Sequence, residues 1–212
     1  MFRWLLDLIR FLRFSRTIAT IPFAAGAYVA AADGNGSPES FAYVFCAIVT
    51  GAVVFLMYNR AYESPRVKHV PRDRERERLF ARVGPRLATG LTVAASLLFV
   101  AIAYQINTTA FYLSPLALVA IFSYVPSRYH TTLNHALLGS ISSLLIMGPY
   151  VAIDGYLSME GLLGGLALLF WVAGFDIVYS LRNVKNAQTH GYATRGPTFA
   201  LYAGGFSQVV GL

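Results

Sequence analysis

Two segments of the sequence place an amide or a carboxylate beside a long apolar run. Asn59 and Glu63 follow one such run and are four residues apart, so on a continuing helix they share a face where an amide and a carboxylate can serve a cation or a phosphate-bound metal. Asp176 is the only acidic residue well within a predicted membrane span, where an ionisable group is costly enough to mark a functional candidate. The structural alternatives are an interfacial cap at the first segment and an ion pair between Asp176 and Arg128 or another basic residue.

Asp176 also begins a stripe of residues with helical spacing. Tyr179 and Asn183 follow it by three and seven residues, and on a helix these positions lie on one face. We expect this face to point into the interior of a helical bundle. Together with Tyr62 and Tyr129, Tyr179 and Asn183 are the candidate lining of a substrate pocket.

The composition places these residues in a membrane protein. Of the 212 residues, 56% are hydrophobic and 13% are charged, whereas soluble domains average about 45–50% apolar and about 25% charged residues. A mean hydropathy of +0.55 leaves too little polar surface to face water, which excludes a water-soluble globule and a disordered chain. The single cysteine, Cys46, makes no intramolecular disulfide, and the four histidines lack ligand spacing, so we assign no zinc or haem to them.

Long uncharged runs predict the elements that must position the candidate residues. A helix needs around 20 apolar residues to cross the hydrocarbon core, and in lipid only helices and closed barrels satisfy the backbone. The runs are too long and too uniformly apolar for barrel strands. The sequence therefore predicts an all-α integral membrane protein with six transmembrane helices, at residues 17–32, 41–58, 87–106, 111–125, 134–153 and 161–181.

The charges are divided between alternate connections. All 17 lysines and arginines lie in the N-terminal segment and in every second connection, and the other connections contain no basic residue. Because basic connections are retained in the cytoplasm, the N-terminus and basic loops are predicted to be cytoplasmic, in a bacterial or archaeal inner membrane. This rule also accounts for the net charge of +7, so the expected partner is the lipid bilayer and no nucleic acid.

The segments outside the predicted spans have their own expected structures. Residues 1–16 mix basic and apolar residues as an interfacial amphipathic helix does, residues 17–197 form the bundle with a cytoplasmic loop at 59–86, and residues 198–212 are an interfacial segment or an incomplete seventh span. Gly161 and Gly165 have the spacing of a close helix contact. We expect this contact inside the bundle, between the fifth and sixth spans, in preference to a surface for another protein.

Several parts of the sequence resemble one family of membrane enzymes. The run 171–179, WVAGFDIVY, resembles the second signature of the UbiA superfamily of membrane prenyltransferases, most closely its 4-hydroxybenzoate polyprenyltransferase branch. The segment 59–71, NRAYESPRVKHVP, is similar to the first signature, and residues 122–129 and 135–149 resemble that branch's fourth connection and fifth span. The resemblance covers essentially the whole chain and implies a UbiA-like helical bundle, although members usually have nine spans and this sequence ends as a seventh begins.

The resemblance implies a metal-dependent chemistry whose ligands are only partly kept. In the family an allylic diphosphate ionises and an aromatic acceptor attacks the carbocation, while two Mg²⁺ ions held by aspartates of both signatures neutralise the diphosphate. Glu63 matches the first aspartate of the first signature, and Val67 occupies the second position unless a deletion follows Glu63. In the second signature Asp176 is kept, but Asn183 and Ala187 replace aspartates. Glu63 and Asp176 are therefore the candidate metal ligands that remain.

Three functions are consistent with this pattern. The leading hypothesis is a degenerate family member without Mg²⁺-dependent transfer and with no assigned cofactor, acting as a structural or isoprenoid- or quinone-binding subunit beside other membrane protein subunits. The first alternative is an active polyprenyl transferase acting on an acceptor such as 4-hydroxybenzoate, with Asn59, Glu63 and Asp176 at Mg²⁺. The second is a carrier or channel with Asp176 on a polar pathway. For the transferase, the candidate diphosphate-binding residues are Arg60, Arg66, Lys68, Arg128, Arg182 and Lys185.

Overall fold

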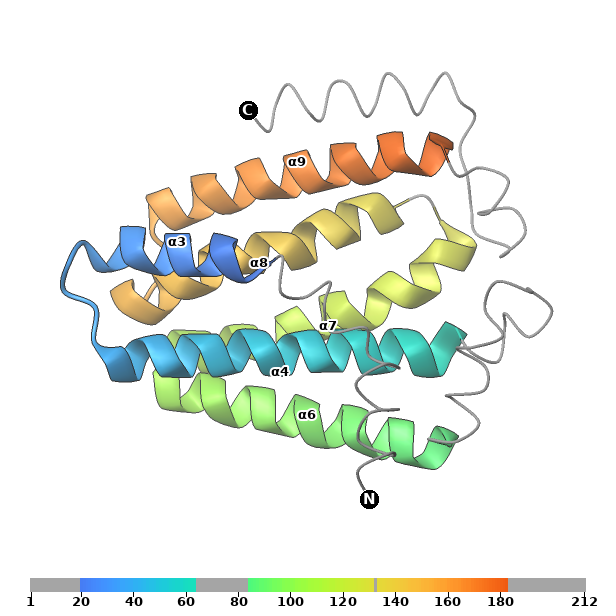
Figure 1. Ribbon diagram of the computed structural model, residues 1–212, viewed down its shortest axis with the longest axis horizontal. Coiled ribbons are helices and arrows are strands. Elements are labelled where there is room, and N and C mark those ends of the chain that lie inside the picture. Colours follow the sequence, from blue (N-terminus) through green and yellow to red (C-terminus); the bar gives the residue numbers. More distant parts are fainter. Residues whose placement is uncertain (1–19, 64–83, 132, 183–212) are drawn as a thin grey trace.

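The computed structural model describes residues 20–63, 84–131 and 133–182, and the side chains of Glu63, Leu181 and Arg182 are not among the described parts. The described residues form six helices and no strand (Figure 1). The prediction of an all-α fold is therefore confirmed. The predictions for residues 1–16 and 198–212 and for most of the loop 59–86 lie outside the described residues. The helices are α3 (Ile21–Ala32), α4 (Pro38–Glu63), α6 (Pro85–Ile106), α7 (Thr108–His130), α8 (Asn134–Asp154) and α9 (Met159–Arg182).

Five of the described helices are long and apolar enough to cross a membrane, namely α4, α6, α7, α8 and α9. Helix α3 has 12 residues, which span about 18 Å, so the first of the six predicted spans remains a prediction. The fourth span is longer than its predicted range of 111–125. Helix α7 begins at Thr108 and continues to His130, with Pro115 and Pro126 inside it, because neighbouring helices help to satisfy the backbone groups that a proline frees.

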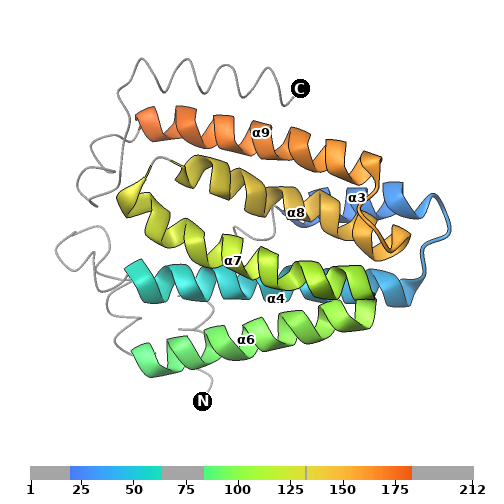
Figure 2. The ribbon, with the colours of Figure 1, turned by 180° about the vertical axis from the view of Figure 1, so that it is seen from behind.

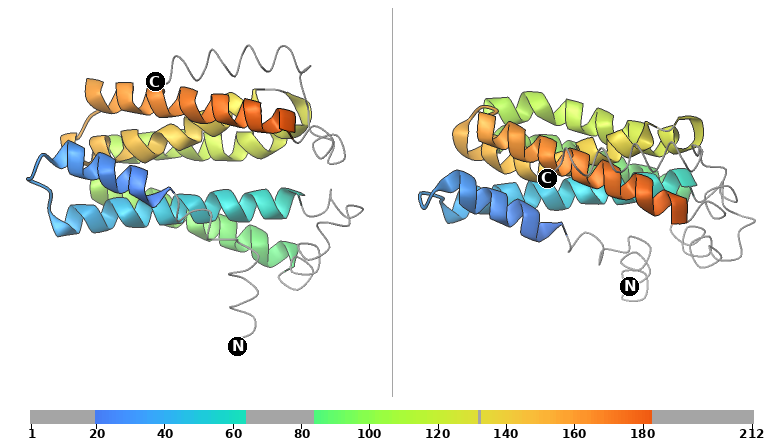
Figure 3. Two further views of the ribbon diagram at one scale, coloured as in Figure 1. Left: turned by 45° about the horizontal axis from the view of Figure 1, so that its top comes forward. Right: turned by 90° about the horizontal axis from the view of Figure 1, so that it is seen from above.

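Helix α8 is the centre of the bundle. It packs most extensively on α9 and also contacts α3, α7 and α4. Helix α6 packs against both α4 and α7. Figure 2 shows α7 and α4 between α6 on one side and α8 with α9 on the other. Figure 3 shows α3 lying beside the α8–α9 pair. Helix α8 therefore joins helices from several parts of the chain.

Consecutive helices run in alternate directions, so charges that are far apart in sequence gather at two opposite ends (Figure 1). The end formed by the last turns of α4 and α7 and the first turn of α6 carries Arg60, Arg128 and Arg86, and we call it the basic end. The opposite end, which we call the acidic end, carries four acidic residues. Asp33 follows α3, and Glu39, Asp154 and Glu160 lie in the terminal turns of α4, α8 and α9.

Polar side chains tie the helices together at the acidic end. The Asn107 side chain accepts a hydrogen bond from the Ala110 amide at 2.8 Å, capping α7, and its Nδ2 donates to the Val151 carbonyl oxygen of α8 at 2.8 Å. The Thr109 hydroxyl donates to the carbonyl oxygen of Gly155, which follows α8. These bonds satisfy backbone groups that helix ends leave without a partner, and they fix the start of α7 against the end of α8.

Glycines bring α8 and α9 into close contact. A Cβ atom added at Gly139 would overlap the backbone carbonyl oxygen of Leu169. Similarly, a Cβ at Gly161 would lie 2.7 Å from the Tyr150 side chain and one at Gly165 would lie 2.5 Å from Met147. The predicted packing of the fifth and sixth spans through Gly161 and Gly165 is therefore confirmed. This packing sets the register between the start of α8 and the end of α9.

We predict that Gly139→Ala destabilises the protein, because the new methyl group meets the backbone of α9 and the helices must separate. The expected cost is about 1–3 kcal/mol in the free energy of unfolding, measured from thermal unfolding in detergent. The matched control is Gly90→Ala in α6, where an added Cβ meets no atom within 4 Å and higher helix propensity favours alanine by up to about 1 kcal/mol. Equal stability of the two variants would contradict the tight contact.

Candidate functional site

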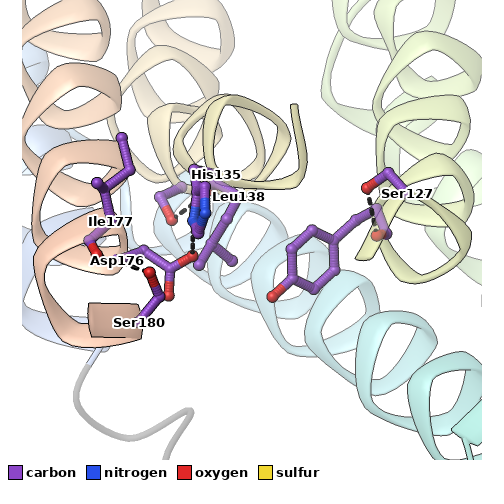
Figure 4. Close-up of polar contacts among 8 residues, drawn as sticks. Ser127, His135, Leu138, Asp176, Ile177 and Ser180 are labelled. Carbon is purple, nitrogen blue, oxygen red and sulfur yellow. Dashed lines mark hydrogen bonds and ion pairs between the residues drawn. The ribbon is translucent and has the colours of Figure 1, made fainter. Parts of the chain in front are cut away.

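The retained aspartate Asp176 contacts a histidine on the neighbouring helix. Asp176 lies in the last part of α9, and His135 lies in the first turn of α8. The His135 Nδ1 and Asp176 Oδ2 atoms are 2.7 Å apart, and Figure 4 shows the two side chains facing one another. The side chains are 15% and 28% exposed, respectively. The pair is therefore partly shielded from solvent, which strengthens the hydrogen bond relative to one on an open surface.

The chemistry of the two groups assigns the proton between them. An ionised carboxylate only accepts hydrogen bonds, so Nδ1 of His135 carries the hydrogen and donates it to Asp176 Oδ2. In a neutral imidazole with hydrogen on Nδ1, Nε2 bears a lone pair and is an acceptor. Among the described residues neither His135 Nε2 nor Asp176 Oδ1 has a hydrogen-bond partner, and neither is one of the fully buried polar atoms. The site therefore offers two accessible acceptors.

The ion pair expected between Asp176 and Arg128 is not what the structure shows. Asp176 joins two helices, as that structural alternative required, but its partner is His135. The Arg128 guanidinium carbon lies 5.7 Å from the centre of the Tyr124 ring, in cation–π geometry. The two residues belong to different helices of the basic end, α9 and α7, and the start of α8 supplies the hydrogen-bond partner of Asp176.

Two of the predicted pocket residues meet where α4 and α7 end. The rings of Tyr62 and Tyr129 lie 5.9 Å apart, and Tyr62 also contacts Tyr58, whose ring is 4.9 Å from that of Phe122. On the same last turns of α4, Asn59 is half-buried and Arg60 is buried, with 8% of its surface exposed. The basic end therefore carries both this aromatic group and the buried Arg60.

Tyr179 belongs to a second aromatic group, on α9, and it is 54% exposed, so the expectation that it points into the interior of the bundle is wrong. Its ring stacks on Phe175 at 6.1 Å, Phe175 stacks on Trp171 at 6.5 Å, and Trp171 meets Phe23 of α3 at 6.2 Å. These four rings, which we call the α9 aromatic track, are between 40% and 59% exposed. The track runs along α9 toward the basic end, so it reaches the level of Asp176 on the same helix.

The side chains of the remaining predicted site residues lie outside the described parts of the structure. Glu63 and Arg182 are the last residues of α4 and α9, and their side chains lie outside the described parts. The other candidates fall in connections that the structure does not describe, namely Arg66, Lys68, Asn183 and Lys185.

The described residues include one of the two candidate metal ligands, Asp176, and not the side chain of the other, Glu63. In the described ranges, no three or more His, Cys, Asp or Glu side chains gather to hold a metal ion. One described carboxylate is fewer than the resembled two-metal chemistry uses, and the hydrogen bond from His135 leaves Oδ1 as its open oxygen. The His135–Asp176 pair suits hydrogen bonding to a ligand that brings its own hydrogen.

Comparison with known proteins decides the family. The model of the UbiA prenyltransferase family matches residues 19–209 of the chain. The chain belongs to the UbiA prenyltransferase family. No curated protein matches the chain.

Two solved structures have the same fold. The apo structure of a UbiA homologue from Aeropyrum pernix K1 is 27% identical, with a TM-score of 0.77 over 93% of this chain and 76% of that chain. A structure of digeranylgeranylglyceryl phosphate synthase in membranes gives a TM-score of 0.83 at 14% identity, over 99% of this chain and 75% of that chain. The second likeness concerns the fold alone. Both agree with the UbiA-like helical bundle.

His135 is the site residue that the sequence analysis missed. It is 41 residues from Asp176, and no ligand spacing links the two. The available signal is the hairpin geometry of α8 and α9, in which residues at similar distances from a short turn lie opposite one another.

We predict that His135 and Asp176 stabilise the protein jointly. A hydrogen bond to a charged group in a partly buried setting gives an expected coupling of about 1–2 kcal/mol. The measurement is a double-mutant cycle of His135→Phe and Asp176→Asn, read by thermal unfolding in detergent. Additive effects of the two changes would contradict the interaction, and His130→Phe at the exposed end of α7 is the matched histidine control.

Proposed function

We propose that this protein binds an isoprenoid lipid in the membrane and does not carry out Mg²⁺-dependent prenyl transfer. The observation that carries the proposal is the hydrogen bond from His135 to Asp176. In the family resemblance Asp176 is the aspartate that remains in the second signature. Because an imidazole on α8 holds one of its two oxygens, only the second oxygen is left for a metal ion, which supports the proposal that this aspartate does not seat two of them.

The substitutions at the other signature positions support the proposal. Val67, Asn183 and Ala187 stand where the resembled pattern has aspartates. A neutral amide is a weak replacement for a carboxylate at Mg²⁺, and valine and alanine supply no ligand. Arg60, which follows Asn59, adds a positive charge in the first signature. The local charge therefore favours anions over cations.

The isoprenoid part of the proposal is supported by family membership and by the aromatic surface of α9. The chain belongs to a prenyltransferase family, and a protein of the same fold is named for a digeranylgeranylglyceryl lipid. Trp171, Phe175 and Tyr179 expose a continuous row of rings. Such a row offers contact to an extended hydrocarbon chain without requiring a polar group.

The proposal also includes the setting of the protein. The basic end, with Arg60, Arg86 and Arg128, is assigned to the cytoplasm by the rule that basic connections are retained there. Binding without transfer suits a subunit that serves other membrane proteins.

An active transferase acting on 4-hydroxybenzoate is the second candidate, favoured by the retention of Asp176 and by the gathering of Arg60 and Arg128 at the same end.

We predict no Mg²⁺-dependent transfer by the purified protein in lipid nanodiscs supplied with a polyprenyl diphosphate, 4-hydroxybenzoate and Mg²⁺. The physical reason is the shortage of free carboxylate oxygens at the basic end. Product is measured by chromatography and mass spectrometry, with Asp176→Ala as the control. Mg²⁺-dependent product that disappears in Asp176→Ala would establish the second candidate instead.

We further predict that the protein is labelled by a tritiated isoprenoid hydrocarbon carrying a diazirine, and that EDTA does not change the yield. The hydrocarbon carries no headgroup, so the assay reports the tail site alone. Labelling of Phe175→Ala with Tyr179→Ala should fall relative to a pair at exposed positions of α6, Leu97→Ala with Leu98→Ala. Equal labelling of the two double variants would contradict the role of the α9 aromatic track.

A further inference from the structure

The His135–Asp176 pair presents hydrogen-bond acceptors and no donor. Asp176 Oδ2 accepts the Nδ1 hydrogen at 2.7 Å, which leaves the lone pair of His135 Nε2 and the second oxygen, Asp176 Oδ1. Both atoms are accessible in the described part of the chain. A group bound here must supply the hydrogen itself.

The charge and ligand number of the pair restrict the chemical class of that group. With neutral His135, the pair carries the single negative charge of Asp176, which repels a phosphate or diphosphate placed directly against it. One imidazole nitrogen and one carboxylate oxygen are too few protein ligands for Zn²⁺, and Mg²⁺ bound through a single carboxylate takes its other ligands from water and phosphate, which a neutral lipid headgroup does not supply. A neutral hydroxyl fits, because it donates one hydrogen to Nε2 or Oδ1 and needs no counter-charge.

The position of the pair fits the end of a lipid molecule. His135 and Asp176 lie near the basic ends of α8 and α9, two helices that are long and apolar enough to cross the bilayer. Phe175 precedes Asp176, and it is 59% exposed and stacked on Tyr179. The acceptors therefore stand beside a surface suited to a hydrocarbon tail, near the basic end of the bundle.

We propose that the His135–Asp176 pair binds the hydroxyl headgroup of an isoprenoid alcohol, which donates its hydrogen to His135 Nε2. Asp176 acts as a positioning residue, because its carboxylate holds the hydrogen on Nδ1 and thereby keeps Nε2 an acceptor. This inference rests on the proposed function for the tail and adds the chemistry of the head.

The test compares geranylgeraniol with its methyl ether, which has the same tail but no hydrogen to donate. Binding to the full chain in nanodiscs is measured by competition with tritiated geranylgeraniol at a fixed lipid ratio. Wild-type protein is expected to prefer the alcohol by about 3- to 10-fold, the value of one accessible hydrogen bond. Equal binding of alcohol and ether by the wild type would overturn the proposal.

Two variants separate this hydrogen bond from a general effect on structure. His135→Phe with Asp176→Leu removes both acceptors, so it should lower the preference for the alcohol to about onefold while leaving binding of the ether unchanged. In Asp176→Asn the amide can donate to Nδ1, so the hydrogen moves to Nε2 and the site becomes a donor. The ether should then bind as well as the alcohol and better than it binds the wild type.

The controls distinguish failure of the head site from failure of the proposed function. His130→Phe, at an exposed position of α7, should keep the wild-type preference. A preference that survives His135→Phe with Asp176→Leu would overturn the head site, while labelling by the hydrocarbon probe would still support the tail site. Loss of hydrocarbon labelling with the alcohol preference intact would overturn the proposed tail site alone.

Discussion

The close approach of α8 and α9 is the constraint on which the site depends. Gly139 allows the backbone of α9 at Leu169 to lie against α8, and Gly161 and Gly165 do the same near the turn. Between two helices in lipid there is no hydrophobic drive to associate, so packing and polar contacts must supply it. The contact fixes the register that sets His135 against Asp176, which in turn makes a neighbouring histidine the hydrogen-bond partner of this aspartate.

The sequence predicted the class of fold because membrane crossing leaves few choices. Uncharged runs located the five long helices, and the spacing of Gly161 and Gly165 indicated the α8–α9 contact. The fourth span was predicted to end at residue 125, but α7 continues through Pro126 to His130. A proline stops a helix in water more readily than within a bundle. His135 was missed although it stands 19 residues before the end of α8 and Asp176 stands 17 residues after the start of α9. Their contact depends on the register of α8 against α9, and the spacing of residues along one helix does not reveal that register.

The arrangement gives a physical reason for separating binding from transfer in this member of the UbiA prenyltransferase family. Departure of a diphosphate requires concentrated positive charge, which metal ions supply when several carboxylates hold them. Here Asp176 is engaged by His135, and Asn183 and Ala187 stand at positions where the resembled signature has aspartates. The features that remain, exposed rings along α9 and a small set of acceptors at its end, suit recognition of a lipid more than ionisation of one.

The tautomer of His135 shows whether the Asp176 carboxylate holds the ring hydrogen on Nδ1. Nuclear magnetic resonance of protein labelled with ¹⁵N in its histidines reports which ring nitrogen carries the hydrogen. The account predicts hydrogen on Nδ1 and a lone pair on Nε2 for neutral His135 in the wild type, with the hydrogen moving to Nε2 in Asp176→Asn. Hydrogen on Nε2 in the wild type, unchanged by that substitution, would show that Asp176 does not hold His135 and would contradict the account.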